Sequence, residues 1–188
     1  MIDPIGLFSQ WYRASLCIEP AAMTLATCNK DCIPSARVVL LKEYSDKGFI
    51  FFTNINSRKG KELIKNPKAA LVFNWIASSR QVRVEGDVGL LDSDKTDKYY
   101  ASRPRESQIS AWCSKQSSVL NDWQDFEQEI KIKNMEFLDK KIPRPSSWVG
   151  FCVIPKVIEF WQAGEHRRHI RHVYTFKNNK WKVEQLYP

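Results

Sequence analysis

The sequence predicts a mainly β protein with additional helices, an α+β chain whose strands form an antiparallel meander or barrel. Two observations carry this prediction. Between residues 23 and 89, short runs rich in β-branched and aromatic residues alternate with turn residues. Helical spacing of apolar residues is confined to the N-terminus, one short insertion and a block between residues 92 and 138. With 188 residues, of which 43% are hydrophobic, the chain fits one domain over residues 1–188.

Five helices are expected, and the first has the clearest start signal. Asp3 supplies an N-cap acceptor and Pro4 suits the first helical position, while Pro20 closes the segment. Its inward face repeats at helical spacing and comprises Ile5, Phe8, Tyr12 and Leu16. The other helices are expected over residues 58–65, 92–102, 105–112 and 122–138. The last of them is amphipathic, with an inward face of Trp123, Phe126, Ile130 and Phe137.

The strands are apolar, β-rich runs that end at turn residues. They are expected over residues 23–28, 37–41, 49–54, 69–75, 81–90, 150–154, 157–161, 173–177 and 181–186. Asn178 and Asn179 form a tight hairpin turn between the last two. The order of elements is that of an antiparallel sheet with helices beside it.

Composition and charge restrict the classes of function. The net charge of +8 indicates an anionic partner, which nucleic acid, acidic lipid or a phosphorylated small molecule would each satisfy. No apolar run approaches the ~20 residues of a membrane-spanning helix, and no secretory signal precedes the first helix. The five cysteines are scattered without a CxxC pair, which is typical of reduced thiols. We therefore expect a cytoplasmic protein with no membrane partner, and neither a disulfide nor a metal site where Cys28 and Cys32 flank a turn.

The segment from residue 102 to residue 118, SRPRESQISAWCSKQSS, is the most informative part of the chain. It places Arg103, Arg105 and Lys115 among six serines and a few apolar anchors. Arginine offers phosphate a planar fork of donors, lysine a point charge, and serine a hydroxyl group. The segment therefore suits a phosphorylated small molecule, although a solvated basic surface has a similar composition.

The same segment resembles the signature region of the pyridoxamine 5'-phosphate oxidase family. The likeness extends over most of the chain, through RVVLLK, FFTN, SRKGKEL, RQVRVEG, PSSWVGF and EFWQAGEHRRH. The resemblance implies an FMN-binding split β-barrel flanked by helices, in a homodimer with FMN at the interface. It also implies oxidation of pyridoxamine 5'-phosphate or pyridoxine 5'-phosphate to pyridoxal 5'-phosphate. In that reaction FMN accepts a hydride from C4' of the phosphorylated B6 vitamer, and O2 reoxidises the flavin with release of hydrogen peroxide.

Two further segments suggest a phosphate site from their residues alone. Arg37 and Lys42 bracket the apolar run VVLL, and strand parity turns them to opposite faces unless the strand bends. Ser57, Arg58 and Lys59 open a helix whose free N–H groups favour an anion, although an ordinary capped surface helix explains them equally well. The resemblance implies a larger set of FMN contacts, some from a second subunit: Arg37, Val38, Val39, Leu40, Leu41, Lys42, Phe52, Thr53, Arg58, Lys59, Gln81, Gln116, Ser117, Trp161 and Arg171.

The resemblance implies a substrate site made of Lys42, Tyr99, Arg103, Ser107, Arg167 and His169, with Arg167 and His169 at the reacting end. Steps of four place Tyr99, Arg103 and Ser107 on one helical face, with Pro104 as a break. The segment GEHRRHIRH also holds all three histidines, but its interleaved arginines would repel a divalent cation, so we expect no metal. Here the sequence departs from the family pattern Arg-x-His-Asp-Arg, because Ile170 replaces the aspartate and Arg168 stands where an apolar residue is usual.

Two alternative functions remain open on the sequence. A related split-barrel flavoprotein would use FMN on another substrate, and the altered loop around Ile170 favours that alternative. A nucleic-acid-binding module would combine the charge of +8 with seven Trp and six Tyr side chains as stacking surfaces. Most of these aromatic residues lie in apolar strand and helix patterns, which is typical of a core, so we expect no nucleic-acid partner.

Overall fold

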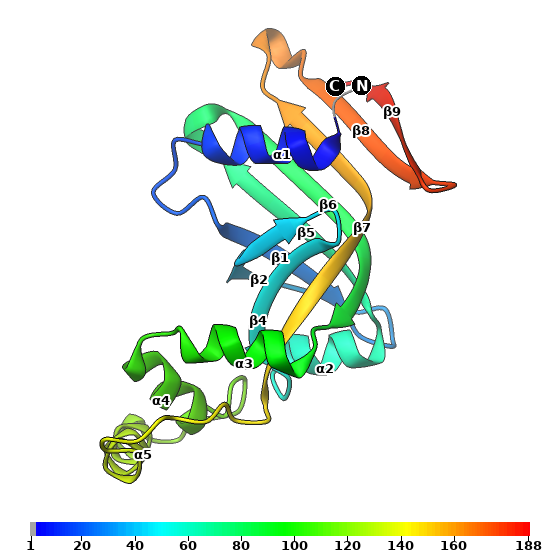
Figure 1. Cartoon of the computed structure of the whole chain (residues 1–188). Helices are drawn as coiled ribbons and strands as arrows, with labels where there is room; N and C mark the ends of the chain where they lie inside the picture. The colour runs from blue at the N-terminus through cyan, green and yellow to red at the C-terminus, as the bar shows by residue number, and fades with distance from the viewer. Residues whose placement is uncertain (1–2) are drawn as a thin grey trace.

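A nine-stranded antiparallel sheet forms the body of the protein in the computed structural model, which describes residues 3–188. The strands follow the path β2-β1-β5-β6-β7-β4-β3, and β8 and β9 extend the sheet beside β7. Their bounds are β1 (Ala22–Cys28), β2 (Pro34–Leu40), β3 (Glu43–Ser45), β4 (Gly48–Asn54), β5 (Lys68–Trp75), β6 (Arg80–Leu90), β7 (Trp148–Gln162), β8 (Ile170–Lys177) and β9 (Lys180–Leu186). The sheet is strongly curved (Figure 1), and the α+β prediction is confirmed.

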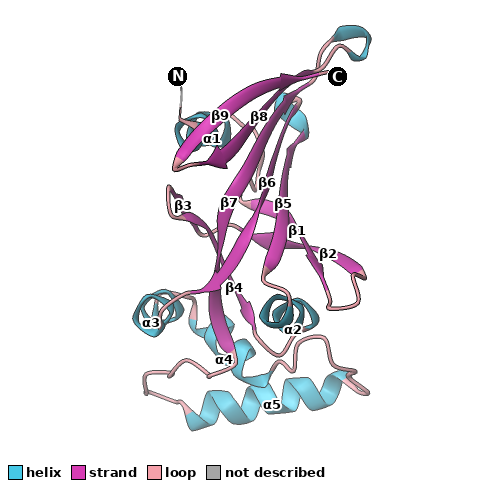
Figure 2. Cartoon of the chain, turned by 90° about the vertical axis from the view of Figure 1, so that its right-hand side faces the viewer, coloured by secondary structure: helices cyan, strands magenta, loops and turns pink. Residues whose placement is uncertain are grey.

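The helices gather at the two ends of the sheet (Figures 1 and 2). Their bounds are α1 (Pro4–Arg13), α2 (Arg58–Lys65), α3 (Ser93–Ala101), α4 (Arg105–Cys113) and α5 (Trp123–Glu136), with short 3-10 turns η1 (Ile76–Ser78) and η2 (Glu165–Arg167). The predicted caps are present, since Asp3 accepts a bond from the Gly6 N–H and Ser57 from the Gly60 N–H. The helix α1 lies near β8 and β9, whereas α2 to α5 lie at the opposite end.

Two apolar clusters stabilise the fold. The larger one fills the curved sheet beneath α1, where the fully buried Phe8 makes edge-to-face contacts with Tyr44, Phe49 and Phe73. The smaller one joins the helices α3, α4 and α5 to the start of β7, and its buried members are Tyr100, Ile109, Cys113, Phe137, Ile142 and Trp148. The helical end is therefore packed against the sheet through Trp148.

The strands predicted over residues 150–154 and 157–161 are one continuous strand, β7. Pro155 interrupts the sequence pattern, but it lies opposite Gly86, where the β6–β7 register shifts. A Cβ atom on Gly86 would come within 2.0 Å of the Ile154 carbonyl oxygen, so only glycine allows this close approach. The bulge therefore accommodates the proline without ending the strand.

Two residues that we predicted to face inward are exposed. Leu16 lies beyond the end of α1, has a left-handed backbone and is 80% exposed. Trp123 begins α5 but is 62% exposed, so periodicity alone assigned it to the wrong side. Over residues 3–188, no helix has the length and apolar character needed to cross a membrane.

Candidate active site

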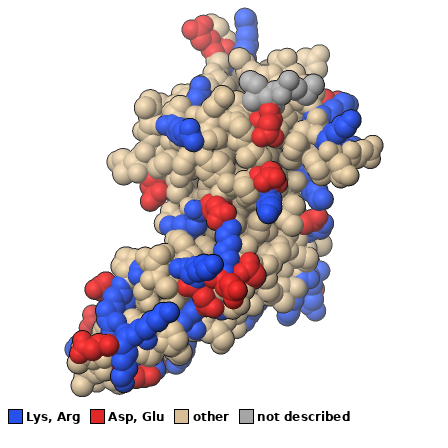
Figure 3. All heavy atoms as spheres, viewed as in Figure 1, with Lys and Arg blue, Asp and Glu red and all other residues tan. Residues whose placement is uncertain are grey.

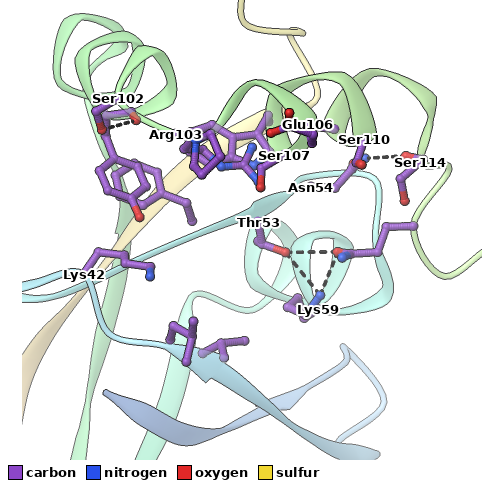
Figure 4. A pocket seen from close by; sticks show the side chains of 18 of the residues that line it. Lys42, Thr53, Asn54, Lys59, Ser102, Arg103, Glu106, Ser107, Ser110 and Ser114 are labelled. Carbon is purple, nitrogen blue, oxygen red and sulfur yellow. Dashed lines mark hydrogen bonds between the residues drawn. The ribbon is translucent and has the colours of Figure 1, made fainter. Parts of the chain in front are cut away.

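A cavity of about 820 Å³ lies between the sheet and the helical end of the molecule. Residues of β2 and β4 line it on one side and residues of α3 and α4 on the other, with Lys59 of α2 at its base (Figure 4). It brings together many residues that the sequence predicted for FMN or substrate: Arg37, Val38, Val39, Leu40, Lys42, Phe52, Thr53, Lys59, Tyr99, Arg103, Ser107 and Gln116. Segments more than 70 residues apart in the sequence therefore share one site.

The Lys59 ammonium is held beside the N-terminus of α2 by neutral oxygens. Its Nζ donates to Gln116 Oε1 at 2.9 Å, to Thr53 Oγ1 at 3.2 Å and to Ser57 Oγ at 3.4 Å. Lys59 is only 8% exposed, and burial together with the charge of Arg37 lowers its pKa. No ion pair among the described residues includes Lys59. Its charge and the helix N-terminus thus remain available to an anion.

Arg37 is tied to a buried carboxylate, that of Glu62 on α2. The Arg37 guanidinium donates to the Leu25 carbonyl at 3.1 Å, to Thr27 Oγ1 at 2.6 Å, to Ser35 Oγ and, at 3.5 Å, to Glu62 Oε2. The two hydroxyls donate onward to the same Glu62 oxygen, at 2.5 Å from Thr27 and 2.6 Å from Ser35. The network fixes the Arg37 side chain at the edge of the cavity.

Glu62 also holds Arg58, whose Nε donates to Glu62 Oε1 at 2.9 Å. Although burial alone raises the pKa of this carboxyl, the hydrogen bonds from Ser35 and Thr27 and the charge of Arg58 lower it to about 2. Glu62 is therefore ionised at neutral pH. One buried anion thus pairs with two cations, Arg37 of β2 and Arg58 of α2, and a net positive charge remains.

Arg103 lines the opposite wall of the cavity, together with Tyr99 and Ser107. The helix α3 ends at Ala101 and α4 begins at Arg105, so the chain breaks around Pro104 as predicted, yet the three side chains still face one cavity. The Arg103 guanidinium lies over the rings of Trp148, at 4.8 Å, and Tyr100, at 5.7 Å. Burial lowers the pKa of Arg103, and its NH1 is buried without a hydrogen-bond partner among the described residues.

Three aromatic rings form a nearly parallel stack beside Arg103. The ring of Phe52 lies 4.2 Å from that of Tyr99 and 4.9 Å from that of Trp148, with interplanar angles of 11° and 4°. Phe52 comes from β4, Tyr99 from α3 and Trp148 from β7. The stack therefore joins the strand next to Lys59 to the helix that precedes Arg103.

Arg37 and Lys42 face the same cavity, although strand parity alone turns them apart. The strand β2 ends at Leu40, and Leu41 then enters the core with 4% of its surface exposed. The Lys42 N–H donates to the Ile50 carbonyl, so the chain bends toward β4 at this point. The bend brings the Lys42 side chain to the cavity, on the wall across from Ser102 and Arg103 (Figure 4).

The remaining predicted residues form a second group at the far end of β6 and β7: Gln81, Trp161, Arg167, His169 and Arg171. Trp161 is 13 residues along β7 from Trp148, which corresponds to about 40 Å of extended strand. Figures 1 and 2 show the loop between β7 and β8 at the end opposite α3 and α4. A single chain therefore does not bring the two groups together.

This second group has defined contacts of its own. The Arg171 Nε donates to Glu159 Oε1 at 2.8 Å, and this bond raises the pKa of Arg171. The His169 ring lies 4.6 Å from the Trp161 ring, and the Gly164 N–H donates to His169 Nδ1 at 3.3 Å. In a neutral imidazole this bond leaves the proton on Nε2, so His169 presents a donor away from its own loop.

Three predicted residues lie outside both groups. Leu41 is in the core, Arg58 is an exposed residue bound to Glu62, and Ser117 lines a neighbouring cavity of about 540 Å³. Sequence reasoning missed Glu62 and Trp148, although the Arg58 to Glu62 spacing of four on a predicted helix was a usable signal. Within residues 3–188, no three His, Cys, Asp or Glu side chains are grouped as metal ligands would be.

Comparisons with known proteins identify the family of the chain. The family described as "Pyridoxamine 5'-phosphate oxidase" matches residues 13–137, and "Pyridoxine 5'-phosphate oxidase C-terminal dimerisation region" matches residues 148–188. A pyridoxine/pyridoxamine 5'-phosphate oxidase of Wolbachia pipientis wMel is 68% identical, over 99% of this chain and 88% of the relative. One of Ehrlichia chaffeensis is 56% identical, over 99% and 98%.

Solved structures support the same assignment. PhzG from Burkholderia lata 383, in complex with tetrahydrophenazine-1-carboxylic acid, is 31% identical with a TM-score of 0.93, over 99% of this chain and 93% of that one. An FMN-binding protein from Nostoc punctiforme is 15% identical with a TM-score of 0.80, over 100% of both chains, and shares the fold. The chain therefore belongs to the pyridoxamine 5'-phosphate oxidase family, whose members are FMN-dependent enzymes with a split-barrel fold.

Proposed function

We propose that the cavity between Lys59 and Arg103 binds FMN and a phosphorylated B6 vitamer side by side. The chain is a pyridoxine/pyridoxamine 5'-phosphate oxidase, which forms pyridoxal 5'-phosphate and hydrogen peroxide with O2 as acceptor. The observation that carries the proposed arrangement is the presence of two separate cation groups in one cavity. Each group suits one phosphate.

The start of α2 fits the phosphate of FMN. Lys59 has only neutral partners, and the free N–H groups of the helix N-terminus add a partial positive charge. Arg37 and Arg58 lie beside it in orientations that Glu62 fixes. We assign Val38, Val39 and Leu40 to the edge of the cofactor, since all three line the cavity between Arg37 and Lys42.

The wall formed by α3 and α4 fits the phosphate of the substrate. Arg103 has no carboxylate partner among the described residues, while Tyr99 and Ser107 supply hydroxyl groups beside it. Lys42 approaches from the opposite wall. Charge-assisted hydrogen bonds from such groups contribute about 1.5–3 kcal/mol each. A vitamer gripped there would place its ring toward the middle of the cavity, next to the flavin.

The second group of residues completes the site from a partner subunit. Arg167, His169, Trp161, Arg171 and Gln81 lie too far from the cavity in their own chain, and they belong largely to the segment matched by the dimerisation region. Val38 and Leu40 of the cavity wall are 65% and 38% exposed in the single chain, as expected of apolar side chains that a bound cofactor and a partner subunit cover. We therefore infer a homodimer with two shared sites.

In this arrangement the protein supplies placement and charge. FMN, when bound, accepts the hydride and passes the electrons to O2. Arg167 and the Nε2–H of His169 would hold the substituents of the vitamer ring, while Lys42 and Arg103 hold its phosphate at the other end. Gripping both ends fixes C4' with respect to the flavin face. A cytoplasmic location stays a prediction, supported by five cysteines that are all unpaired.

The alternatives fit less well. The chain shares 68% identity with a named oxidase but 31% with PhzG, which favours a B6 vitamer over another substrate. Lys and Arg side chains are mixed with Asp and Glu on the face shown in Figure 3, which bears no continuous basic stripe for nucleic acid.

The experiment that tests the function is a visible absorption spectrum of the purified protein under exclusion of air, before and after addition of pyridoxamine 5'-phosphate. We expect a flavin spectrum that bleaches, because hydride transfer reduces FMN. A folded protein that binds no FMN in excess cofactor would contradict the proposal.

Mixing variants tests the shared site. Arg103→Ala and Arg167→Ala should each be poorly active alone. After their subunits are exchanged in equal amounts, half of the dimers carry one intact site, so about a quarter of the sites should recover. No recovery after verified exchange would place both arginines in one subunit's site.

A further inference from the structure

Arg103 differs from many of the other arginines of the described chain in what holds it. Arg37, Arg58, Arg83, Arg144 and Arg171 each pair with a carboxylate. Arg103 makes no ion pair and no side-chain hydrogen bond within residues 3–188, and its NH1 is buried. Its guanidinium therefore needs another kind of support, or it would adopt many orientations.

That support comes mainly from one aromatic face. The Trp148 ring lies 4.8 Å from the Arg103 guanidinium carbon, closer than the Tyr100 ring at 5.7 Å, and indole is the strongest of the aromatic cation-binding faces. The backbone of Arg103 is held as well, since its N–H donates to the Tyr100 carbonyl and its carbonyl accepts from Gln108 Nε2 at 2.8 Å. The Trp148 ring therefore determines only the direction in which the Arg103 guanidinium points.

Trp148 is itself fixed in position. It is 8% exposed, it pairs with Asn54 at the start of β7, and its carbonyl accepts from Arg144 NH1 at 2.8 Å. Its other neighbour in the stack is Phe52, with the rings almost parallel. A rigid ring therefore lies behind a cation that faces the cavity.

We propose that Trp148 is a positioning residue, which holds the Arg103 guanidinium toward the substrate phosphate and so sets the preference of the enzyme for phosphorylated vitamers. The inference rests on the proposed function of the cavity. Although Trp148 also lines the cavity, the inference assigns it a role through Arg103 and none at the reacting atoms. Because this role concerns only the phosphate, replacing Trp148 should not change the turnover of an unphosphorylated vitamer.

The test compares Trp148→Leu with wild type on pyridoxamine 5'-phosphate and on pyridoxamine, with FMN saturating. We expect KM for the phosphorylated vitamer to rise roughly tenfold with kcat nearly unchanged, because a desolvated cation–π pair has about that effect on binding. The kcat/KM for pyridoxamine should stay within about twofold, since no phosphate is present. Trp148→Phe should give a smaller rise in KM, and it keeps the test available if the leucine variant does not fold.

Trp112→Leu is the matched control. Trp112 packs against the same apolar cluster and carries its own cation, Lys133, but it neither lines the cavity nor contacts Arg103. Trp112→Leu should leave the kinetic constants for both vitamers unchanged, although it should lose about as much folding stability as Trp148→Leu. In the Arg103→Ala background, Trp148→Leu should raise KM no further, as two residues of one unit are not additive.

Three results would overturn the inference. One is an equal loss of kcat/KM for both vitamers in Trp148→Leu, which would mean that Trp148 has a general structural role. Another is the same phosphate-specific loss in Trp112→Leu, and the third is full additivity with Arg103→Ala. A wild-type protein that turns over neither phosphorylated vitamer would overturn the proposed function, and this inference with it.

Discussion

The two cation groups of the cavity are built in opposite ways. Beside α2, the buried carboxylate of Glu62 pairs with Arg37 and with the exposed Arg58, and hydroxyl groups complete this network, while Lys59 next to it has only neutral partners. On the wall of α3 and α4, Arg103 has no carboxylate and rests on aromatic rings. The first group is held in place by ionic hydrogen bonds, the second by apolar faces.

The difference teaches how a site separates a resident ligand from one that exchanges. A compensated network is rigid before any ligand arrives, so the ligand meets fixed donors. A cation without a carboxylate partner keeps its full attraction for a phosphate; Lys59 has this property inside the fixed network, whereas Arg103 has it with only aromatic rings around it. We infer that the first design suits a cofactor that stays bound, and the second a substrate that leaves as product in every turnover.

The largest expected effect comes from removing Arg103. Arg103→Ala should raise KM for pyridoxamine 5'-phosphate about 100-fold, because charge-assisted bonds to phosphate have no replacement on this wall. Steady-state kinetics at saturating FMN measure it. A KM within threefold of wild type would mean that Lys42 and Ser107 bind the substrate phosphate without Arg103.

Removing the buried anion tests the compensated group. Glu62→Gln should lower the free energy of unfolding by about 2 kcal/mol at pH 7, since two cations lose their anionic partner and one of the two accepting oxygens becomes an NH2 group that cannot accept. Urea unfolding followed by fluorescence measures this free energy. Unchanged stability in Glu62→Gln would mean that the network does not stabilise the fold.

The Glu62 carboxylate should also make the stability of the fold depend on pH in the acid range. Its pKa is about 2 in the folded protein, below the ordinary 4.5, so its contribution is complete above about pH 4.5 and is lost as the pH falls toward 2. The wild type should therefore lose more stability than Glu62→Gln over this interval. Parallel acid titrations would show equal slopes if Glu62 were not involved.

The cofactor phosphate should depend on Lys59. Lys59→Ala is expected to weaken FMN binding roughly 20-fold while leaving riboflavin binding unchanged, because riboflavin lacks the phosphate. Flavin fluorescence titrations of the apoprotein measure both. Equal weakening for the two flavins would place Lys59 against the ring system.

A neutral member of the network should matter least. Thr27→Val keeps the shape of the side chain but removes the hydroxyl that joins Arg37 to Glu62, which should lower the free energy of unfolding by about 1 kcal/mol. Urea unfolding beside Glu62→Gln measures it. If Thr27→Val lost more free energy of unfolding than Glu62→Gln, the hydroxyl group would contribute more to the network than the charge of Glu62, contrary to the proposal.

Much of the fold followed from local signals. The helix over residues 58–65 has the predicted bounds, because a serine cap and Asn66-Pro67 define its ends. Pairing across the sheet is not a local property, so the sequence predicted two strands on either side of Pro155, where a bulge in β7 opposite Gly86 lets one strand continue. The prediction of a single domain over residues 1–188 stays a prediction.

The candidate site was predictable in its residue types rather than in its arrangement. Family resemblance supplied the cations, and helical spacing grouped Tyr99, Arg103 and Ser107. The supports of those cations, Glu62 and Trp148, were missed, because each acts on a residue brought near by the fold or the helix turn. That Trp161 lies at the far end of the sheet from the cavity follows from the length of β7, which places about 40 Å of strand between Trp148 and Trp161.

The most direct test of the two-group account is the FMN content of Arg103→Ala and Lys59→Ala, purified side by side. We predict wild-type flavin content in Arg103→Ala and a clear deficit in Lys59→Ala, since the two phosphates are held by different side chains. Equal flavin loss in both variants would contradict the account.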